Sequence, residues 1–338
     1  MSTMSSQADG HCHYSGSLSR QYLQNRIDFL FPHQGIPVSN FLPQFTLNWE
    51  KNFKQFFDSY QKVQLLTQSA IPEEQYQLYS SGAYDICKNY ILEGVSSFDL
   101  RAGPKLKLSG TVDRLSAMIE GFNNAENEFN TSKKARLILT LIHDQKGKFT
   151  NVNISSLTEL LAYLDTNKKI ANRVIGFDFS GPEICIDSHM FFSLLNLIEK
   201  YNSNDEHLKK YIITIHAGEY SDKDTIFPRL SFIDQLLNHK INRISHGTIL
   251  WLNPSLINTD KQKEIETYQN RLLNKIADKN IILEICPTSN LLLSPLKKIS
   301  DIPFQKFNKL GIKYTINTDN KTLIGTNLSR EISLTQSH

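Results

Sequence analysis

The chain has 338 residues, of which 40% are hydrophobic and 21% are charged, a composition typical of a folded globular protein rather than a disordered one. Lys and Arg (37) nearly balance Asp and Glu (34), so the net charge is only +3, which argues against nucleic acid and membrane surfaces as partners. The longest apolar runs, such as residues 191–198, are too short to cross a bilayer.

The N-terminal segment MSTMSSQADG has neither a basic start nor an apolar stretch, so we expect no secretory signal. The cysteines show no C-x-x-C spacing, which argues against a zinc finger and against a disulfide framework. They are Cys12, Cys87, Cys185 and Cys286. Scattered cysteines suit a reducing compartment, and we therefore expect a cytoplasmic protein.

Short apolar, β-branched runs alternate with longer helical patterns along the chain. The runs predicted as strands cover residues 94–100, 135–142, 173–179, 211–215, 242–245, 280–285 and 312–317. The helical patterns between them cover residues 155–165, 188–201, 225–237 and 261–278. The strand runs are almost continuously apolar, which is typical of strands buried on both faces. The alternation predicts parallel strands joined by right-handed crossovers.

Counting the segment around His11 and His13 as a first strand gives eight β/α units, which favours an α/β fold of the (β/α)₈ TIM-barrel type. We expect a single domain over residues 1–338 with a helical insertion at about residues 20–90. The first strand is the weakest prediction, because SSQADGHCH is polar for a barrel interior. In the insertion, WEKNFKQFFDSYQKVQLL has apolar residues every three or four positions and predicts a helix. This helix either covers the mouth of the barrel or simply packs against it.

Polar residues recur where the predicted strands end, which is the end at which barrels of this type build active sites. The strand-end segments contain Gly181, His216, Glu219, His246, Ser289, Asn290, Asp319 and Asn320. His11 and His13 are two positions apart on a strand and therefore face the same side. With His216 and one carboxylate they would form a catalytic metal site, with Zn²⁺ as the favoured ion.

Each of these residues also has a structural interpretation. An H-x-H pair near a terminus occurs by chance, His216 alone could be a hydrogen-bonded core histidine, and Asp319 alone could be a helix N-cap. Single short motifs are weak evidence. Their joint occurrence in chain order, each at the end of a strand, favours the functional interpretation.

Six segments together resemble the adenosine/AMP deaminase family, a group of metal-dependent amidohydrolases. They are HCHYSGSL, GFDFSGPE, HAGE, RISHGTIL, EICPTSN and INTDN. The resemblance extends from about residue 9 to about residue 331, and HAGE and EICPTSN are its most specific segments. It implies a hydrolase acting on a cyclic amidine C–N bond, which converts adenosine or deoxyadenosine to inosine or deoxyinosine and ammonia.

The resemblance also implies roles for individual residues. One Zn²⁺ per chain would be held by His11, His13, His216 and Asp319. Glu219 would protonate the purine at N1, and His246 would orient and help activate the attacking water, with Asp319 also taking part in proton transfer. Gly181 would contact N3, Asn320 would contact N7, and His13 and Ser15 would border the substrate.

Three features depart from the family pattern. Asn320 stands where a second aspartate is usual, which removes a charge but leaves an amide able to donate to N7. Ser15 stands where adenosine-specific members carry an aspartate that binds the 5′-hydroxyl, so a repulsion against a 5′-phosphate is absent. The chain also ends about nineteen residues after Asp319, and we expect a short C-terminus with a curtailed last helix.

Alternative functions follow from these departures. The enzyme could act on AMP, on N6-modified or 5′-modified adenine nucleosides, or on free adenine. The chain could instead be a purine-binding homologue without catalysis, or a general metal-dependent hydrolase of esters or amides. The complete ligand set and the acid in HAGE favour ring deamination of a small purine. The preferred substrate, the metal and the oligomeric state are open at this point.

Overall fold

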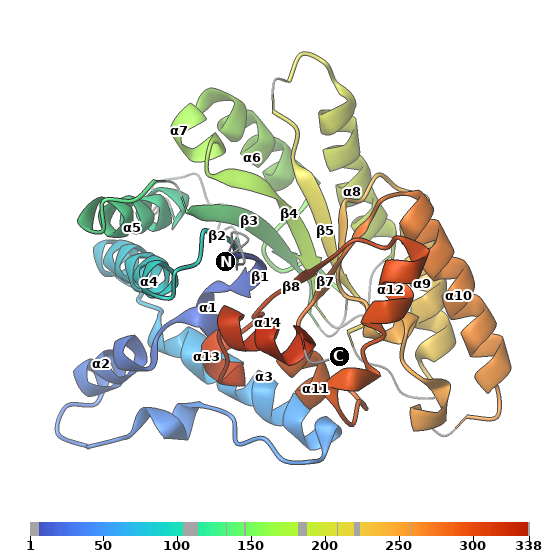
Figure 1. Cartoon of the computed structure of the whole chain (residues 1–338). Coiled ribbons are helices and arrows are strands. Elements are labelled where there is room, and N and C mark those ends of the chain that lie inside the picture. The colour runs from blue at the N-terminus through green and yellow to red at the C-terminus, as the bar shows by residue number, and fades with distance from the viewer. Residues whose placement is uncertain are drawn as a thin grey trace, which may run out of the picture.

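The structure is a computed structural model that describes residues 7–103, 114–132, 134–144, 147–181, 188–207, 209–219, 224–257 and 259–336. Eight strands form one sheet of parallel neighbours in the order β1 to β8 (Figure 1). They are β1 (Ala8–His13), β2 (Ser97–Ala102), β3 (Ala135–Ile142), β4 (Val174–Ser180), β5 (Ile212–Ala217), β6 (Arg243–His246), β7 (Ile282–Ile285) and β8 (Tyr314–Ile316). Beyond β8, the N–H of Asp319 donates to His11 (2.8 Å) and its carbonyl accepts from His13 (2.9 Å). These bonds bring the two edges together, and the predicted (β/α)₈ architecture is confirmed.

The strand bounds agree with the prediction to within a few residues. The strand predicted over residues 135–142 is β3, with the same first and last residues. The run predicted from residue 94 begins later, at Ser97, because Gly94 has a φ of +73° and turns the chain out of the preceding helix. Likewise β7 begins at Ile282 rather than at Asn280, because Asn280 has a left-handed φ of +55°.

The polar first strand does occupy the barrel wall. Asp9 is fully buried, and its carboxylate accepts hydrogen bonds from the hydroxyls of Tyr90 (2.8 Å) and Thr318 (2.6 Å). Burial raises the pKa of Asp9, and these hydrogen bonds counteract part of that rise. Because buried polar groups are tolerated when they are hydrogen-bonded, the polarity of this strand is compatible with a barrel interior.

The helices alternate with the strands and surround the barrel (Figure 1). Those after β2 are α5 (Arg114–Glu128), α6 (Ile154–Thr166), α7 (Lys168–Ala171), α8 (Ser188–Ser203), α9 (Ile226–Leu236), α10 (Gln262–Asp278), α11 (Pro287–Leu293), α12 (Phe304–Leu310), α13 (Lys321–Ile324) and α14 (Leu328–Gln336). The four helical patterns of the sequence correspond to α6, α8, α9 and α10. The short α13 and α14 follow β8.

The predicted insertion between β1 and β2 is helical. It contains α2 (Arg20–Leu30), α3 (Trp49–Leu66) and α4 (Pro72–Leu92), after the short α1 (Tyr14–Ser17). The side chain of Asn48 accepts a hydrogen bond from the Lys51 N–H and caps α3. α3 packs against α1 and α11, and Asn52 Nδ2 donates to the carbonyl of Leu292 (3.0 Å). Since α1 follows β1 and α11 follows β7, α3 lies at the carboxyl end of the barrel.

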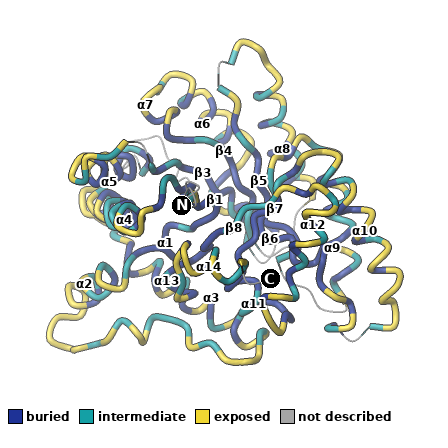
Figure 2. Tube along the Cα trace, in the orientation of Figure 1, coloured by how far each residue is buried: buried dark blue, intermediate teal, exposed yellow. Residues whose placement is uncertain are grey.

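The strands and the inward faces of the helices are buried, and the outer faces of the helices are exposed (Figure 2). One apolar core therefore runs between the sheet and the surrounding helices. Among the residues that the structure describes, no helix combines the length and the apolar character that a membrane span requires.

Candidate active site

Four predicted ligands converge at the carboxyl ends of β1, β5 and β8. Nε2 of His13 lies 3.1 Å from Nε2 of His11 and 3.2 Å from Nε2 of His216. Oδ1 of Asp319 lies 3.5 Å from Nε2 of His11 and 3.4 Å from Nε2 of His13. Candidate ligand atoms of the three histidines all lie within 4.8 Å of one another.

These separations fit a single metal ion of the size of Zn²⁺. Ligand atoms about 2.0–2.1 Å from a tetrahedral Zn²⁺ are separated from each other by roughly 3.3–3.4 Å. The four measured separations, 3.1 to 3.5 Å, fall around that value. Three imidazole nitrogens this close cannot each carry a proton, whereas one cation between them would satisfy all three. The donor set therefore suits a divalent metal with nitrogen-rich ligation.

Two buried carboxylates orient the ligating imidazoles. Oε2 of Glu284 lies 3.2 Å from Nδ1 of His11, and Oδ1 of Asp178 lies 2.9 Å from Nδ1 of His216. An ionised carboxylate accepts from Nδ1–H and so leaves Nε2 free to bind a metal. Burial alone would raise the pKa of Glu284, but Arg101 and the histidine outweigh burial and hold this pKa well below its ordinary value.

Arg101 lies beneath the cluster and balances both carboxylates. Its side chain is buried, and it forms ion pairs with Glu284 and, through Nε, with Asp178 Oδ2 at 3.5 Å. Burial alone would lower the pKa of Arg101, but Glu284 and Asp178 outweigh it and the pKa is raised. The guanidinium therefore stays charged and keeps both carboxylates ionised.

His246 ends β6 and faces the predicted acid, Glu219, which follows β5. Its Nε2 lies 3.8 Å from Oε1 of Glu219. Oδ1 of Asn290 accepts from the N–H of Cys286 (3.1 Å), and this fixes the amide so that Nδ2 faces Nδ1 of His246 (3.2 Å). Nδ1 of His246 must then accept, so Nε2 carries the ring proton and points towards Glu219.

Two of these residues have an unusual backbone conformation. His246 has a φ of +65° and Asp319 a φ of +59°, a region that residues other than glycine seldom adopt. Such strain clusters at functional sites, where the surrounding structure imposes it. Asp319 is further held by Ser289, whose hydroxyl donates to Oδ2 at 2.7 Å.

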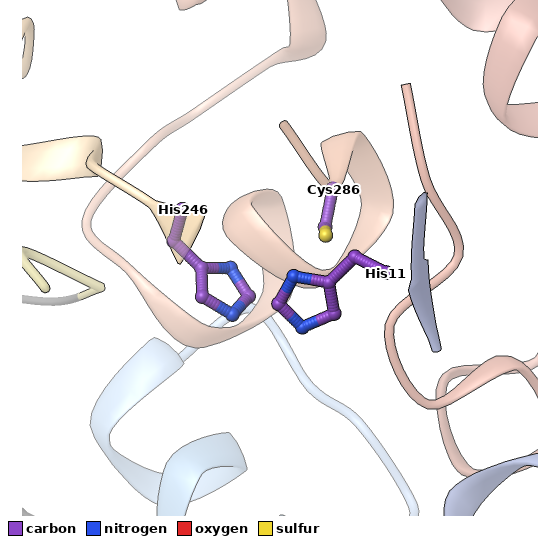
Figure 3. Close-up of side chains that lie close together, drawn as sticks. All are labelled: His11, His246 and Cys286. Carbon is purple, nitrogen blue, oxygen red and sulfur yellow. The ribbon is translucent and has the colours of Figure 1, made fainter. Parts of the chain in front are cut away.

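A second group of possible metal-binding residues contains His11, His246 and Cys286. Figure 3 shows the two imidazole rings side by side, with the Cys286 thiol directed towards them. Burial raises the pKa of Cys286 well above its ordinary value, and a protonated thiol is a poor ligand. The group with His13 and His216 also has the carboxylate of Asp319 beside it, so we favour that group as the metal site.

The remaining predicted residues border the same region. Ser15 lies in α1, directly after β1, and is 7% exposed. Gly181 follows β4 with a φ of +149°, and a Cβ there would lie 2.4 Å from the carbonyl oxygen of His143, so only glycine fits. Nδ2 of Asn320 donates to Oδ1 of Asp319 at 2.6 Å. Its Oδ1 is buried without a partner and faces Gly16, where a Cβ would lie 2.0 Å away.

Several residues at this site were missed in the sequence. Three of them are charged residues within otherwise apolar strands, and a charge at such a position was the signal that could have found them. They are Asp178, Glu284 and Arg101.

An eight-stranded parallel barrel with this histidine and aspartate cluster at the carboxyl ends of its strands has the architecture of the amidohydrolases. Comparisons with known proteins agree. The sequence profile described as Adenosine deaminase matches residues 6–338. The chain therefore belongs to the adenosine deaminase family.

Individual relatives give the same result. The chain is 27% identical over 335 residues to an adenosine deaminase of Streptococcus agalactiae, a match covering 97% of this chain and 83% of that protein. Among solved structures, the N6-methyl-AMP deaminase of Arabidopsis thaliana superposes with a TM-score of 0.69 at 20% identity, covering 98% of this chain and 86% of that one. A zinc-bound amidohydrolase of Burkholderia ambifaria gives a TM-score of 0.68 at 18% identity, covering 98% and 80%. At these identities the two structures support the fold alone.

Proposed function

We propose that the chain, acting as one deaminase domain over residues 1–338, hydrolyses the C6 amino group of an adenine nucleoside or nucleotide and releases ammonia. The observation that carries this proposal is the cluster of His11, His13, His216 and Asp319 at spacings of 3.1 to 3.5 Å, with Glu219 and His246 beside it. Membership of the adenosine deaminase family supports it.

One Zn²⁺ per chain is the cofactor we assign to these four ligands. When bound, such an ion supplies Lewis-acid activation of a water molecule near neutral pH. Burial lowers the pKa of His13 well below its ordinary value, so this imidazole is neutral and available as a ligand at pH 7. Asp178 and Glu284 keep the lone pairs of the other two imidazoles directed at the same point.

The side chains around the cluster have separate roles in this proposal. Glu219 donates a proton to N1 of the purine, which lets the ring accept the electron pair when water attacks C6. His246, with its proton on Nε2, orients the attacking oxygen. Asp319 accepts one proton released by the water and passes it to the amino group. Ammonia then leaves as the C6 hydroxyl becomes a carbonyl and gives its proton back to Glu219.

Other residues would position the substrate. We assign the backbone of Gly181 to purine N3, and His13 and Ser15 to the border of the substrate. Asn320 would contact N7 through the amide hydrogen that it does not donate to Asp319. The second candidate is an AMP or N6-modified adenine nucleotide deaminase. It is favoured by the neutral side chain of Ser15, which does not repel a 5′-phosphate.

Metal analysis followed by a substrate screen tests the proposal. The purified chain should contain about one zinc per chain and should release ammonia from at least one of adenosine, deoxyadenosine, AMP, N6-methyl-AMP and adenine. Ultraviolet absorbance follows the loss of the amino group. Full metal loading with no ammonia from any of these would favour the non-catalytic purine-binding alternative.

A further inference from the structure

Arg114 is an arginine near the barrel mouth that the mechanism above does not use. It is the first residue of α5, and helices of this barrel begin at the carboxyl ends of the strands. Its Cζ lies 4.4 Å from the ring centroid of Tyr79 and 5.7 Å from that of Tyr14. Nη1 donates to the carbonyl of Gly103 at 2.6 Å. The aromatic rings and this carbonyl hold the guanidinium in place.

The charge of Arg114 has no counter-ion in the described part of the chain. No carboxylate there lies within 4.0 Å of its guanidinium, and its Nε is buried without a hydrogen-bond partner. Arg101 and Arg173, by contrast, each contact a buried carboxylate. A partly buried cation that uses one of five donors is costly unless an anion completes it.

Tyr60 lies on α3, which packs against α1 at the carboxyl end of the barrel. Burial raises the pKa of Tyr60, a hydrogen bond with Ser15 and the charge of Arg114 lower it, and the charge of Asp319 raises it. α1 carries Ser15, and Arg114 lies over the ring of Tyr14, the residue directly before Ser15. Tyr60, Ser15 and Arg114 therefore lie on elements that meet at the end of the barrel where the metal ligands lie.

We propose that Ser15, Tyr60 and Arg114 form a subsite for the 5′-phosphate of an adenine nucleotide, an inference that rests on the proposed function. A phosphate monoester carries nearly two negative charges and three acceptor oxygens at neutral pH. The guanidinium fork matches this geometry, and the two hydroxyls supply further donors. A neutral 5′-hydroxyl would supply no counter-ion to Arg114. The subsite therefore selects nucleotides over nucleosides.

Equilibrium binding of the reaction products tests the subsite without turnover. We expect calorimetry to show that IMP binds the wild-type protein more tightly than inosine. Arg114→Gln should lower the affinity for IMP by about ten- to a hundredfold. It should change the affinity for inosine by less than about threefold. Arg114→Lys, which keeps the charge but not the fork, should recover part of the IMP affinity. Arg330→Gln is the matched control, because it removes an exposed arginine of α14. It should leave the affinities for IMP and inosine unchanged.

Ser15→Asp is a second variant, which decides the question if Arg114→Gln does not fold. A carboxylate at this position would repel the phosphate and pair with the Arg114 guanidinium. The affinity for IMP should therefore fall, while the affinity for inosine is retained or increased. Inorganic phosphate should compete with IMP in the wild-type protein and not in Arg114→Gln. This competition experiment distinguishes recognition of the phosphate from recognition of the rest of the nucleotide.

Other results would overturn the subsite. Equal loss of IMP and inosine affinity in Arg114→Gln would mean that Arg114 only packs α5 against Tyr79. Wild-type protein that binds IMP no tighter than inosine would reject the subsite while leaving adenosine deamination intact. Conversely, Arg114-dependent IMP binding without ammonia release from any substrate would retain the subsite and reject the proposed function.

Discussion

Nδ1 of His216 lies 2.9 Å from Oδ1 of Asp178, a carboxylate on the neighbouring strand that is itself paired with Arg101. Glu284 stands in the same relation to His11, again with Arg101 behind it. One buried arginine therefore balances two carboxylates, and each carboxylate fixes the orientation of one imidazole. The metal site depends on this layer as well as on the ligands.

Asp178→Asn tests this supporting layer. The amide keeps an acceptor for His216 but loses the charge that pairs with Arg101, so the imidazole is held less firmly. We expect metal affinity, measured by competition with a chelator, to fall by about 10–100-fold while the circular dichroism spectrum is retained. Asp234→Asn is the control, because Asp234 pairs with Arg271 and Lys275 on the outer helices. An unchanged metal dissociation constant would show that Asp178 does not position the ligand.

His11→Ala tests the ligand set directly. The alanine removes one of the four ligands of this site and leaves a gap in the coordination shell, so elemental analysis should show the metal lost and ammonia release should disappear with it. His239→Ala is the matched control, since His239 contacts Glu199 away from the site and should leave the metal bound. Full metal occupancy in His11→Ala would show that the H-x-H pair is not part of the metal site.

Glu219→Gln tests the proton donor. Gln is close in size but cannot supply the proton needed in the transition state, so kcat should fall by about 10²–10⁴-fold with little change in metal content or melting temperature. Steady-state ammonia release and elemental analysis on the same sample separate the two effects. Turnover close to wild type would exclude ring protonation by this residue.

Glu126→Gln probes pH-dependent stability at the opposite end of the barrel. Glu126 accepts from Nη2 of Arg173 (2.6 Å) and from the N–H of Lys134 (2.7 Å). Burial alone would raise its pKa, but Arg173 and the backbone donors outweigh burial and lower it. A lowered folded-state pKa means that the stabilisation is complete above the ordinary value of 4.5 and is lost as the pH falls through the folded-state pKa.

We therefore expect Glu126→Gln to reduce the free energy of unfolding at pH 7 by about 1.5–3 kcal/mol. The difference from wild type should shrink below the ordinary pKa, as the wild-type carboxylate takes up a proton. Denaturant melts between pH 7 and pH 3 measure this, with the exposed Glu264→Gln as control. A difference that stays constant across this range would mean that packing, and not the ion pair, carries the effect.

Sequence by itself determined the alternation of strands and helices, because the periods of 2 and 3.6 residues are local properties. The 135–142 run became β3 and the WEKNFKQFFDSYQKVQLL segment became α3, with their predicted bounds. The spacing of His11 and His13 also placed both rings on one face before any partner was known. The position at a strand end then indicated His216, and the family resemblance identified Asp319 as the carboxylate; both are more than 200 residues distant in the chain.

Tertiary structure alone decided which buried charges meet. Glu284 contacts His11 and Arg101 across the barrel, at sequence separations of 273 and 183 residues, and no local pattern encodes such a pairing. α3, which carries Tyr60, packs against α1, which carries Ser15, only because the insertion folds over the carboxyl end of the strands. Barrel closure brings these groups together, since the distances between side chains across a closed sheet depend on strand register and shear rather than on local sequence.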